Sequence, residues 1–207
     1  MIRDIIWDFD GTLFDTYPNA VNSFKRALED CGVNESDENI LNYIKVSEGH
    51  AVAFFKEFYG LNDTFIDKLN LHKKNIELNL IKPFPFAVEF CKKFAALGGR
   101  NYIITHRGSS AEEIIGNHGM LEFFTEIITK KSGFKRKPDP ESFLYLIEKY
   151  NINKNSALVV GDRELEILSG KAAGIYTCLY NTNNIEFTEI PNYYIDSLEK
   201  LDEVINF

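Results

Sequence analysis

Apolar and polar residues follow two alternating periods along most of the chain. Short apolar runs, typical of buried strands, are separated by stretches in which apolar residues recur every three or four positions, as on one face of a helix. This alternation predicts an α/β fold with a Rossmann-like, mostly parallel sheet and helices on both of its faces. We expect strands at 2–8, 101–105, 125–128, 157–161, 175–179 and 193–195, and helices at about 84–97, 109–118, 140–150 and 164–173.

The stretch between the first two predicted strands is too long for a simple crossover. Residues 15–82 have the spacing of four successive helices, the last of which extends over 65–80. A Pro-rich segment at 83–85 ends this pattern. We therefore expect a helical cap domain at 15–82, inserted into a core formed by 1–14 and 83–207, with a plain extension of the core as the alternative.

Composition narrows the class of protein. The 207 residues carry a formal net charge of −8, which argues against a non-specific nucleic-acid partner. Cys31, Cys91 and Cys178 are scattered, which favours reduced structural thiols. No apolar stretch approaches the roughly 20 residues of a membrane helix, and a strand rather than a signal peptide begins almost at Met1. We expect a cytoplasmic protein without a membrane partner, either a monomer or a homodimer.

The strongest chemical signal stands at the end of the first predicted strand. Asp8 and Asp10 lie two residues apart in the segment Asp-Phe-Asp-Gly-Thr, so in an extended chain they share one face and repel each other. A divalent cation bound by carboxylate oxygens offsets that repulsion. Gly11 allows the sharp turn that follows. A solvated Asp–Gly turn is the alternative interpretation.

Two further segments point to an anionic ligand. Thr105 ends a predicted strand and precedes a turn at His106 and Arg107, where a hydroxyl and backbone amides suit a phosphate oxygen. Lys137 precedes Pro138 in a stiff basic loop, and its ammonium can offset crowded carboxylates and pair with a phosphoryl group. A strand-terminal threonine and a solvated basic loop are common, so neither segment is specific alone.

A last acidic pair follows the predicted strand at 157–161. Asp162 leaves that strand, and Glu166 lies four residues later on about the same helical face. These acids face Asp8 across the sheet edge and suit Mg²⁺, which takes few carboxylates and keeps several waters. Acidic residues that favour a helix N-terminus are the alternative explanation.

Taken in order, these four segments resemble the motifs of the haloacid dehalogenase-like hydrolase superfamily, in its phosphoglycolate phosphatase and β-phosphoglucomutase branch. The resemblance covers the whole chain: Asp-x-Asp-Gly-Thr, a strand-terminal Thr, Lys-Pro-x-Pro and Gly-Asp-x-x-x-acid. The segment 15–82 looks like the helical cap of that branch. One departure is Glu166, where Asp is more usual, so its contact with the metal is direct or through water.

The resemblance implies a Mg²⁺-dependent phosphatase of a small phosphorylated metabolite, of the phosphoglycolate or sugar-phosphate type. Asp8 is then the nucleophile that forms an aspartyl-phosphate, and Asp10 is the general acid and base. The implied phosphate ligands are Thr105, His106 and Lys137. The implied metal ligands are Asp8, Asp10 through its backbone carbonyl, Asp162 and Glu166.

Two alternatives remain open at this point. A phosphomutase uses the same residues and returns the phosphoryl group to a sugar, whereas a non-catalytic binding protein has no need for the full set. Asp10 favours phosphate esters, because dehalogenases of similar fold lack an acid at that position. Substrate recognition is expected from Lys45, Ser47, Glu48 and His50 in the insertion and from Arg107, with solvent exposure as the alternative for each.

Overall fold

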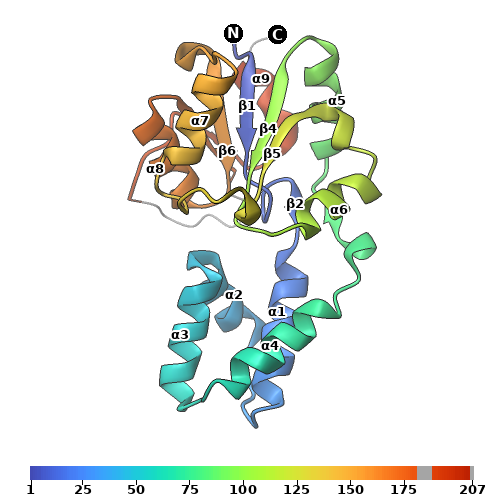
Figure 1. Cartoon of the computed structure of the whole chain (residues 1–207), viewed down its shortest axis with the longest axis vertical. Coiled ribbons are helices and arrows are strands. Elements are labelled where there is room, and N and C mark those ends of the chain that lie inside the picture. The colour runs from blue at the N-terminus through green and yellow to red at the C-terminus, as the bar shows by residue number, and fades with distance from the viewer. Residues whose placement is uncertain (181–187, 206–207) are drawn as a thin grey trace. The chain divides into compact units, whose positions relative to one another are not determined.

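The computed structural model of the chain describes residues 1–180 and 188–205. Its contacts divide the chain into two compact units (Figure 1). The core unit comprises Met1–Asp15 and Lys82–Phe207, and the helical unit comprises Thr16–Ile81.

The core unit contains a six-stranded sheet in which β1 (Asp4–Trp7) is an inner strand. The order is β5-β4-β1-β6-β7-β8, and every neighbouring pair is parallel. The parallel α/β fold expected from the alternating periods is thereby confirmed. The other strands are β4 (Arg100–Ile104), β5 (Phe124–Ile128), β6 (Ala157–Gly161), β7 (Tyr176–Tyr180) and β8 (Tyr193–Ile195).

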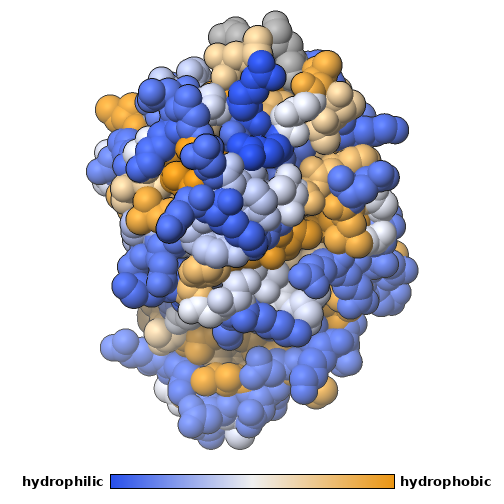
Figure 2. Space-filling model, turned by 45° about the horizontal axis from the view of Figure 1, so that its top comes forward, coloured by the Kyte–Doolittle hydropathy of each residue, from blue (hydrophilic) through white to orange (hydrophobic). Residues whose placement is uncertain are grey.

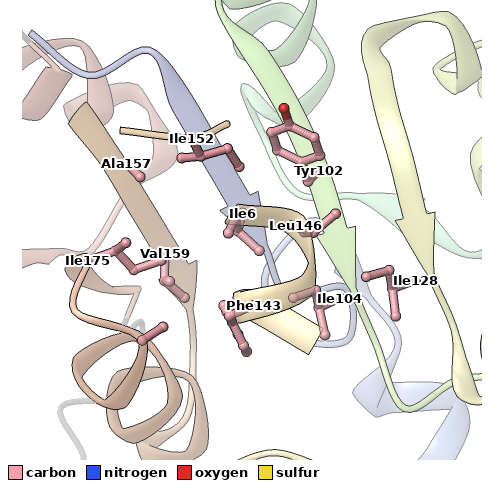
Figure 3. Close-up of a cluster of buried hydrophobic side chains, with 11 residues drawn as sticks. Ile6, Tyr102, Ile104, Ile128, Phe143, Leu146, Ile152, Ala157, Val159 and Ile175 are labelled. Carbon is pink, nitrogen blue, oxygen red and sulfur yellow. The ribbon is translucent and has the colours of Figure 1, made fainter. Parts of the chain in front are cut away.

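Adjacent residues of β1 bury their side chains on opposite faces of this sheet. Ile6 packs in one cluster with Phe143 and Leu146 of α7 (Glu141–Lys149) (Figure 3). Trp7 meets Phe90 of α5 (Ala87–Ala96) edge-on, with ring centres 5.6 Å apart. Helices therefore cover both faces, as expected. The core helices are α5 (Ala87–Ala96), α6 (Ser110–Asn117), α7 (Glu141–Lys149), α8 (Glu164–Ala173) and α9 (Leu201–Ile205), with short 3-10 turns at Leu121–Phe123, Lys130–Ser132, Lys154–Ser156 and Leu198–Lys200.

Four helices form the helical unit around a core that includes Phe24, Phe55 and Phe65. They are α1 (Tyr17–Glu29), α2 (Asp37–Val46), α3 (Glu48–Tyr59) and α4 (Thr64–Lys74). The fourth helix is shorter than its apolar spacing predicts.

The predicted extension of α4 to residue 80 is wrong. The helix stops at Lys74, and Leu78–Leu80 forms a separate 3-10 turn. Beyond Lys74, Ile76 and Leu78 are only half-buried and Leu80 is 58% exposed, so this stretch has little apolar surface to bury by staying helical.

Two very short strands frame the helical unit in the chain. Phe14–Asp15 (β2) and Lys82–Pro83 (β3) pair antiparallel, with Phe14 opposite Pro83 and Asp15 opposite Lys82. Nothing in the apolar pattern predicts this pairing, because neither strand is long enough to show a period.

The surface is mostly hydrophilic on the face drawn in Figure 2, where hydrophobic residues form small separate groups. Among the residues described, no helix is long and apolar enough to cross a membrane.

Candidate active site

Three of the predicted site residues follow neighbouring strands at one edge of the sheet. Asp8 follows β1, Thr105 follows β4 and Asp162 follows β6. Since β1 pairs with both β4 and β6, the carboxyl ends of these strands lie side by side. The chain order of the strands also reverses at β1, which is where open parallel sheets bind ligands.

The loop after β1 is held by backbone and side-chain hydrogen bonds. The amide of Asp8 donates to the carbonyl of Val160 at 2.9 Å. Gly11 has a φ of 82°, a value that glycine adopts readily, and its amide donates to the carbonyl of Phe14. The Thr12 hydroxyl donates to Oδ1 of Asp162 at 3.4 Å, which links the loop to the end of β6. The turn predicted at Gly11 therefore lies in a loop that brings Thr12 to Asp162 at the end of β6.

Lys137 places its ammonium between two buried carboxylates. Its Nζ lies 2.5 Å from Oδ1 of Asp8 and 2.7 Å from Oε1 of Glu166, and it also donates to the carbonyl of Ile104 at 3.2 Å. Each of the three charged side chains is at most 2% exposed. The structure thus brings together Asp8, Lys137 and Glu166.

The buried environment shifts the pKa values of these three groups in different directions. Burial raises the pKa of Asp8 to about 6, although Lys137 acts in the opposite direction. Burial also opposes the charge of Glu166, but the attraction of Lys137 and Arg163 outweighs it and holds the pKa of Glu166 below its usual range. For Lys137, burial is again outweighed, here by the two carboxylates, and its pKa is raised. Lys137 is therefore charged, and Glu166 keeps its negative charge to a lower pH than Asp8 does.

Arg163 is a site residue that the sequence motif did not single out. Its Nη2 lies 3.4 Å from Oε1 of Glu166 and 3.9 Å from Oδ1 of Asp8, and its Nε lies 3.8 Å from Oδ1 of Asp162. The sequence did offer one signal for Arg163, because this cationic residue lies between the two motif acids Asp162 and Glu166. Its guanidinium adds a second positive charge beside the buried acids.

Glu166 is pressed against the glycine that begins the same motif. A Cβ atom on Gly161 would lie 2.3 Å from Cγ and 2.5 Å from Cβ of Glu166. The amide of Arg163 also donates to Oε2 of Glu166 at 3.2 Å. These contacts direct the Glu166 carboxylate to Lys137 and Arg163.

The residues at this edge of the sheet fit a bound Mg²⁺. Oδ2 of Asp8 is buried and has no hydrogen-bond partner among the residues described, which leaves a carboxylate oxygen for a cation. Asp162 follows β6, the strand that pairs with the one preceding Asp8, and offers a second carboxylate. No group of three or more His, Cys, Asp or Glu side chains in the described ranges is arranged as a metal cage.

Asp10 is paired with Arg107, a contact that the sequence did not predict. Nε and Nη2 of Arg107 both donate to Oδ1 of Asp10, at 3.0 and 2.5 Å. The guanidinium carbon of Arg107 also lies 5.5 Å from the centre of the Phe9 ring. Arg107 therefore stands next to the residue predicted as acid and base.

Thr105 and His106 support the loops around the site. The Thr105 hydroxyl accepts a hydrogen bond from the amide of Arg107 at 3.1 Å. Nε2 of His106 accepts from the amide of Lys137 at 2.9 Å, and Nδ1 lies 3.3 Å from Nη2 of Arg136. Burial, together with the charges of Lys137 and Arg136, lowers the pKa of His106 to about 3. A neutral His106 thus holds the Lys137 loop, while its expected contact with phosphate stays a prediction.

The structure places four of the residues expected to recognise the substrate at the junction of α2 and α3: Lys45, Ser47, Glu48 and His50. The Ser47 hydroxyl caps α3 by accepting from the amide of His50 at 3.0 Å. Glu48 pairs with Lys73 at 2.5 Å. These contacts lie within the helical unit, and the role of the four residues in recognition stays a prediction.

Comparison with known proteins identifies the family. The model of the haloacid dehalogenase-like hydrolases matches residues 5–180. A candidate pyrophosphatase PpaX of Clostridium perfringens is 30% identical over 99% of this chain and 98% of its own length. A phosphoglycolate phosphatase of Vibrio parahaemolyticus is 27% identical over 99% of this chain and 96% of its own length. The chain belongs to the haloacid dehalogenase-like hydrolase family.

Solved structures agree with this assignment. A hydrolase from Streptococcus pneumoniae is 32% identical, with a TM-score of 0.70 over 100% of this chain and 99% of that one. The hydrolase YfnB of Bacillus subtilis, solved with bound magnesium, shares the fold with a TM-score of 0.77 at 21% identity, over 100% of this chain and 99% of that one. The protein is accordingly an enzyme of the phosphoric monoester hydrolase class, which confirms that expectation from the sequence.

Proposed function

We propose that the protein is a Mg²⁺-dependent phosphatase that hydrolyses a small phosphorylated metabolite through an aspartyl-phosphate on Asp8. The observation that carries the proposal is the environment of Asp8. One of its oxygens is bound by Lys137, and the other is buried without a hydrogen-bond partner among the residues described. A carboxylate in this position can attack phosphorus while a cation screens its charge.

Asp8 supplies the attacking oxygen in this mechanism. Lys137 stays protonated beside it and offers positive charge to the phosphoryl oxygens, which gain charge as the phosphorus–oxygen bonds rearrange. The Thr105 hydroxyl and the turn amides after β4 complete the phosphate site. Glu166 and His106 act indirectly, because each holds Lys137 in place.

Asp10 handles the protons of both half-reactions. It donates a proton to the leaving alkoxide when the aspartyl-phosphate forms, and then accepts one from the water that hydrolyses it. The same carboxyl group thus ends the cycle in the state in which it began.

Mg²⁺ would be held by the Asp8 carboxylate, the backbone carbonyl of Asp10 and the Asp162 carboxylate. When bound, it neutralises negative charge between nucleophile and phosphate. Glu166 is already engaged with Lys137 and Arg163. We therefore assign it the role of positioning Lys137 and not that of a direct metal ligand.

The relatives narrow the range of substrates to be tested. Their names refer to phosphoglycolate and to pyrophosphate, both small phosphorylated compounds. A suitable panel therefore contains phosphoglycolate, pyrophosphate, sugar phosphates and a generic aryl phosphate.

The deciding experiment measures phosphate release from this panel with Mg²⁺ and with EDTA. Asp8→Asn removes the nucleophile, while Asp202→Asn changes a half-exposed surface acid that pairs with Lys93 and serves as the matched control. We expect metal-dependent release that the first variant loses and the second retains. An isomerised sugar phosphate without free phosphate would indicate a mutase, and no product from any compound would refute the proposal.

A further inference from the structure

The guanidinium of Arg107 is held on one edge and open on another. Of its five N–H groups, two donate to Oδ1 of Asp10, and one on Nη1 points to the Ser110 hydroxyl at 3.5 Å. One N–H on Nη1 and one on Nη2 have no partner among the residues described. Two N–H groups on different nitrogens form the fork that binds a carboxylate or phosphoryl group through two hydrogen bonds.

The surroundings of Arg107 keep this fork in one orientation. Asp10 binds the side of the guanidinium that carries Nε, and the Phe9 ring lies 5.5 Å from its central carbon. The Arg107 side chain is 22% exposed, so it is anchored but reachable. A guanidinium fixed in this way loses little conformational freedom when it binds an anion.

The position of the fork defines which part of a substrate it meets. As general acid, Asp10 has to lie within about 3 Å of the oxygen that leaves with the product. Arg107 is the direct neighbour of Asp10 and is therefore on the leaving-group side of the phosphorus. An anion bound by its fork belongs to the leaving group and lies only a few bonds from the scissile bond.

We infer that Arg107 determines substrate specificity by binding a second anionic group, a carboxylate or phosphoryl group, carried by the leaving group of the substrate. This inference rests on the proposed function and adds the substrate class: compact phosphate compounds with two anionic groups. Asp10 then has two tasks, because it transfers protons and also anchors the specificity residue.

Two substrates of nearly equal size test whether the enzyme recognises a second anionic group. Phosphoglycolate carries a carboxylate where 2-phosphoethanol carries a neutral hydroxymethyl group. The wild-type enzyme should have a kcat/KM for phosphoglycolate about 10- to 100-fold above that for 2-phosphoethanol, the range expected for hydrogen bonds to a charged group. A wild-type ratio near one would overturn the inference without any variant.

Variants test whether the preference belongs to Arg107. Arg107→Gln should reduce the ratio of the two kcat/KM values about tenfold or more, with the loss seen mainly in KM for phosphoglycolate. Arg107→Lys keeps the charge but not the fork and should give an intermediate ratio. Arg3→Gln alters an exposed arginine at the opposite end of β1 and should leave the ratio unchanged.

The outcomes distinguish this inference from the proposed function. If Arg107→Gln lowers both kcat/KM values equally, the residue only supports Asp10 and the inference is wrong, while the phosphatase proposal stands. If wild-type protein releases no phosphate even from the aryl phosphate, the proposed function fails and the inference fails with it.

Discussion

The ammonium of Lys137 and the carboxylate of Asp8 form an ion pair in which both side chains are almost fully buried, with Nζ 2.5 Å from Oδ1. The pair comes from loops 129 residues apart in the chain. Its burial makes the site sensitive to the loss of either charge, because an unpaired buried charge is costly.

Removal of the Lys137 charge should therefore destabilise the protein strongly. Lys137→Met leaves Asp8 and Glu166 facing each other without their ammonium, and we expect a loss of about 3–5 kcal/mol in the free energy of unfolding. Urea denaturation followed by circular dichroism measures it. Lys135→Met is the matched control, since Lys135 is 71% exposed and its pairing with Asp139 spans 3.5 Å, and it should cost less than about 1 kcal/mol. Equal effects of the two variants would contradict the importance of the buried pair.

Gly161 should not tolerate even one added methyl group. In Gly161→Ala the new Cβ would meet Cβ and Cγ of Glu166, atoms near the root of that side chain that cannot swing away. We expect a loss of about 1–3 kcal/mol in stability, together with reduced turnover as Glu166 moves from Lys137.

The control for this glycine is provided by the helical unit. Gly49 is the second residue of α3, and apart from its chain neighbours and the backbone of its own helix no heavy atom lies within 4 Å of an added Cβ, so Gly49→Ala should stabilise the protein by up to about 0.5–1 kcal/mol. Both variants can be compared in one series of urea titrations. An unchanged midpoint for Gly161→Ala would mean that Glu166 repacks freely.

Acidification should weaken the fold through His106. Its pKa is about 3 in the folded protein against an ordinary value of 6.5, so between these values the unfolded chain binds a proton that the folded chain does not. The contribution of His106 to stability is then complete above pH 6.5 and is lost as the pH falls toward 3, by at most about 1.4 kcal/mol per pH unit.

This pH dependence is measurable with His106→Asn, which cannot titrate. Unfolding free energies of both proteins, taken from pH 8 to pH 4, should differ in slope below pH 6.5, with the wild type losing stability more steeply. Parallel curves would show that His106 takes up its proton in the folded state as readily as in the unfolded one.

Addition of Mg²⁺ should raise the melting temperature of the wild-type protein. A ligand that binds only the folded state stabilises it by about 2.7 kcal/mol at one hundred times its dissociation constant, which corresponds to a shift of several degrees for a chain of this size. Asp162→Asn should lose most of this shift, whereas Asp196→Asn, at a half-exposed acid paired with Lys200, should keep it. Identical shifts in the two variants would exclude Asp162 as a ligand.

The sequence was sufficient to predict the edge of the sheet at which the site lies. Asp8, Thr105 and Asp162 were expected there because each follows an apolar run, and parallel strands bring their carboxyl ends to one edge. This inference depends on periodicity alone. The six strands of the sheet and the helices α5 to α8 followed from the same periods, within a few residues, whereas the short helix α9 was not predicted.

The pairings of side chains at that edge were beyond such reasoning. Arg107 and Asp10 are 97 residues apart, and their contact depends on how two loops turn after their strands. Arg163 likewise occupies a position that the motif leaves variable. The conformation of a loop leaves no periodic pattern in the sequence. The sequence therefore predicted that these charged residues gather at one edge of the sheet, but not which of them form pairs.

The antiparallel pairing of β2 with β3 has a consequence for how this chain can change. The backbone leaves the core at Asp15 and re-enters it at Lys82, two residues that face each other across hydrogen-bonded strands. A short turn can therefore join these points, as in an ordinary hairpin, without rerouting any strand of the sheet. The helical unit is in this sense a replaceable module: its length and sequence can be exchanged wholesale while the path of the chain through the core is preserved.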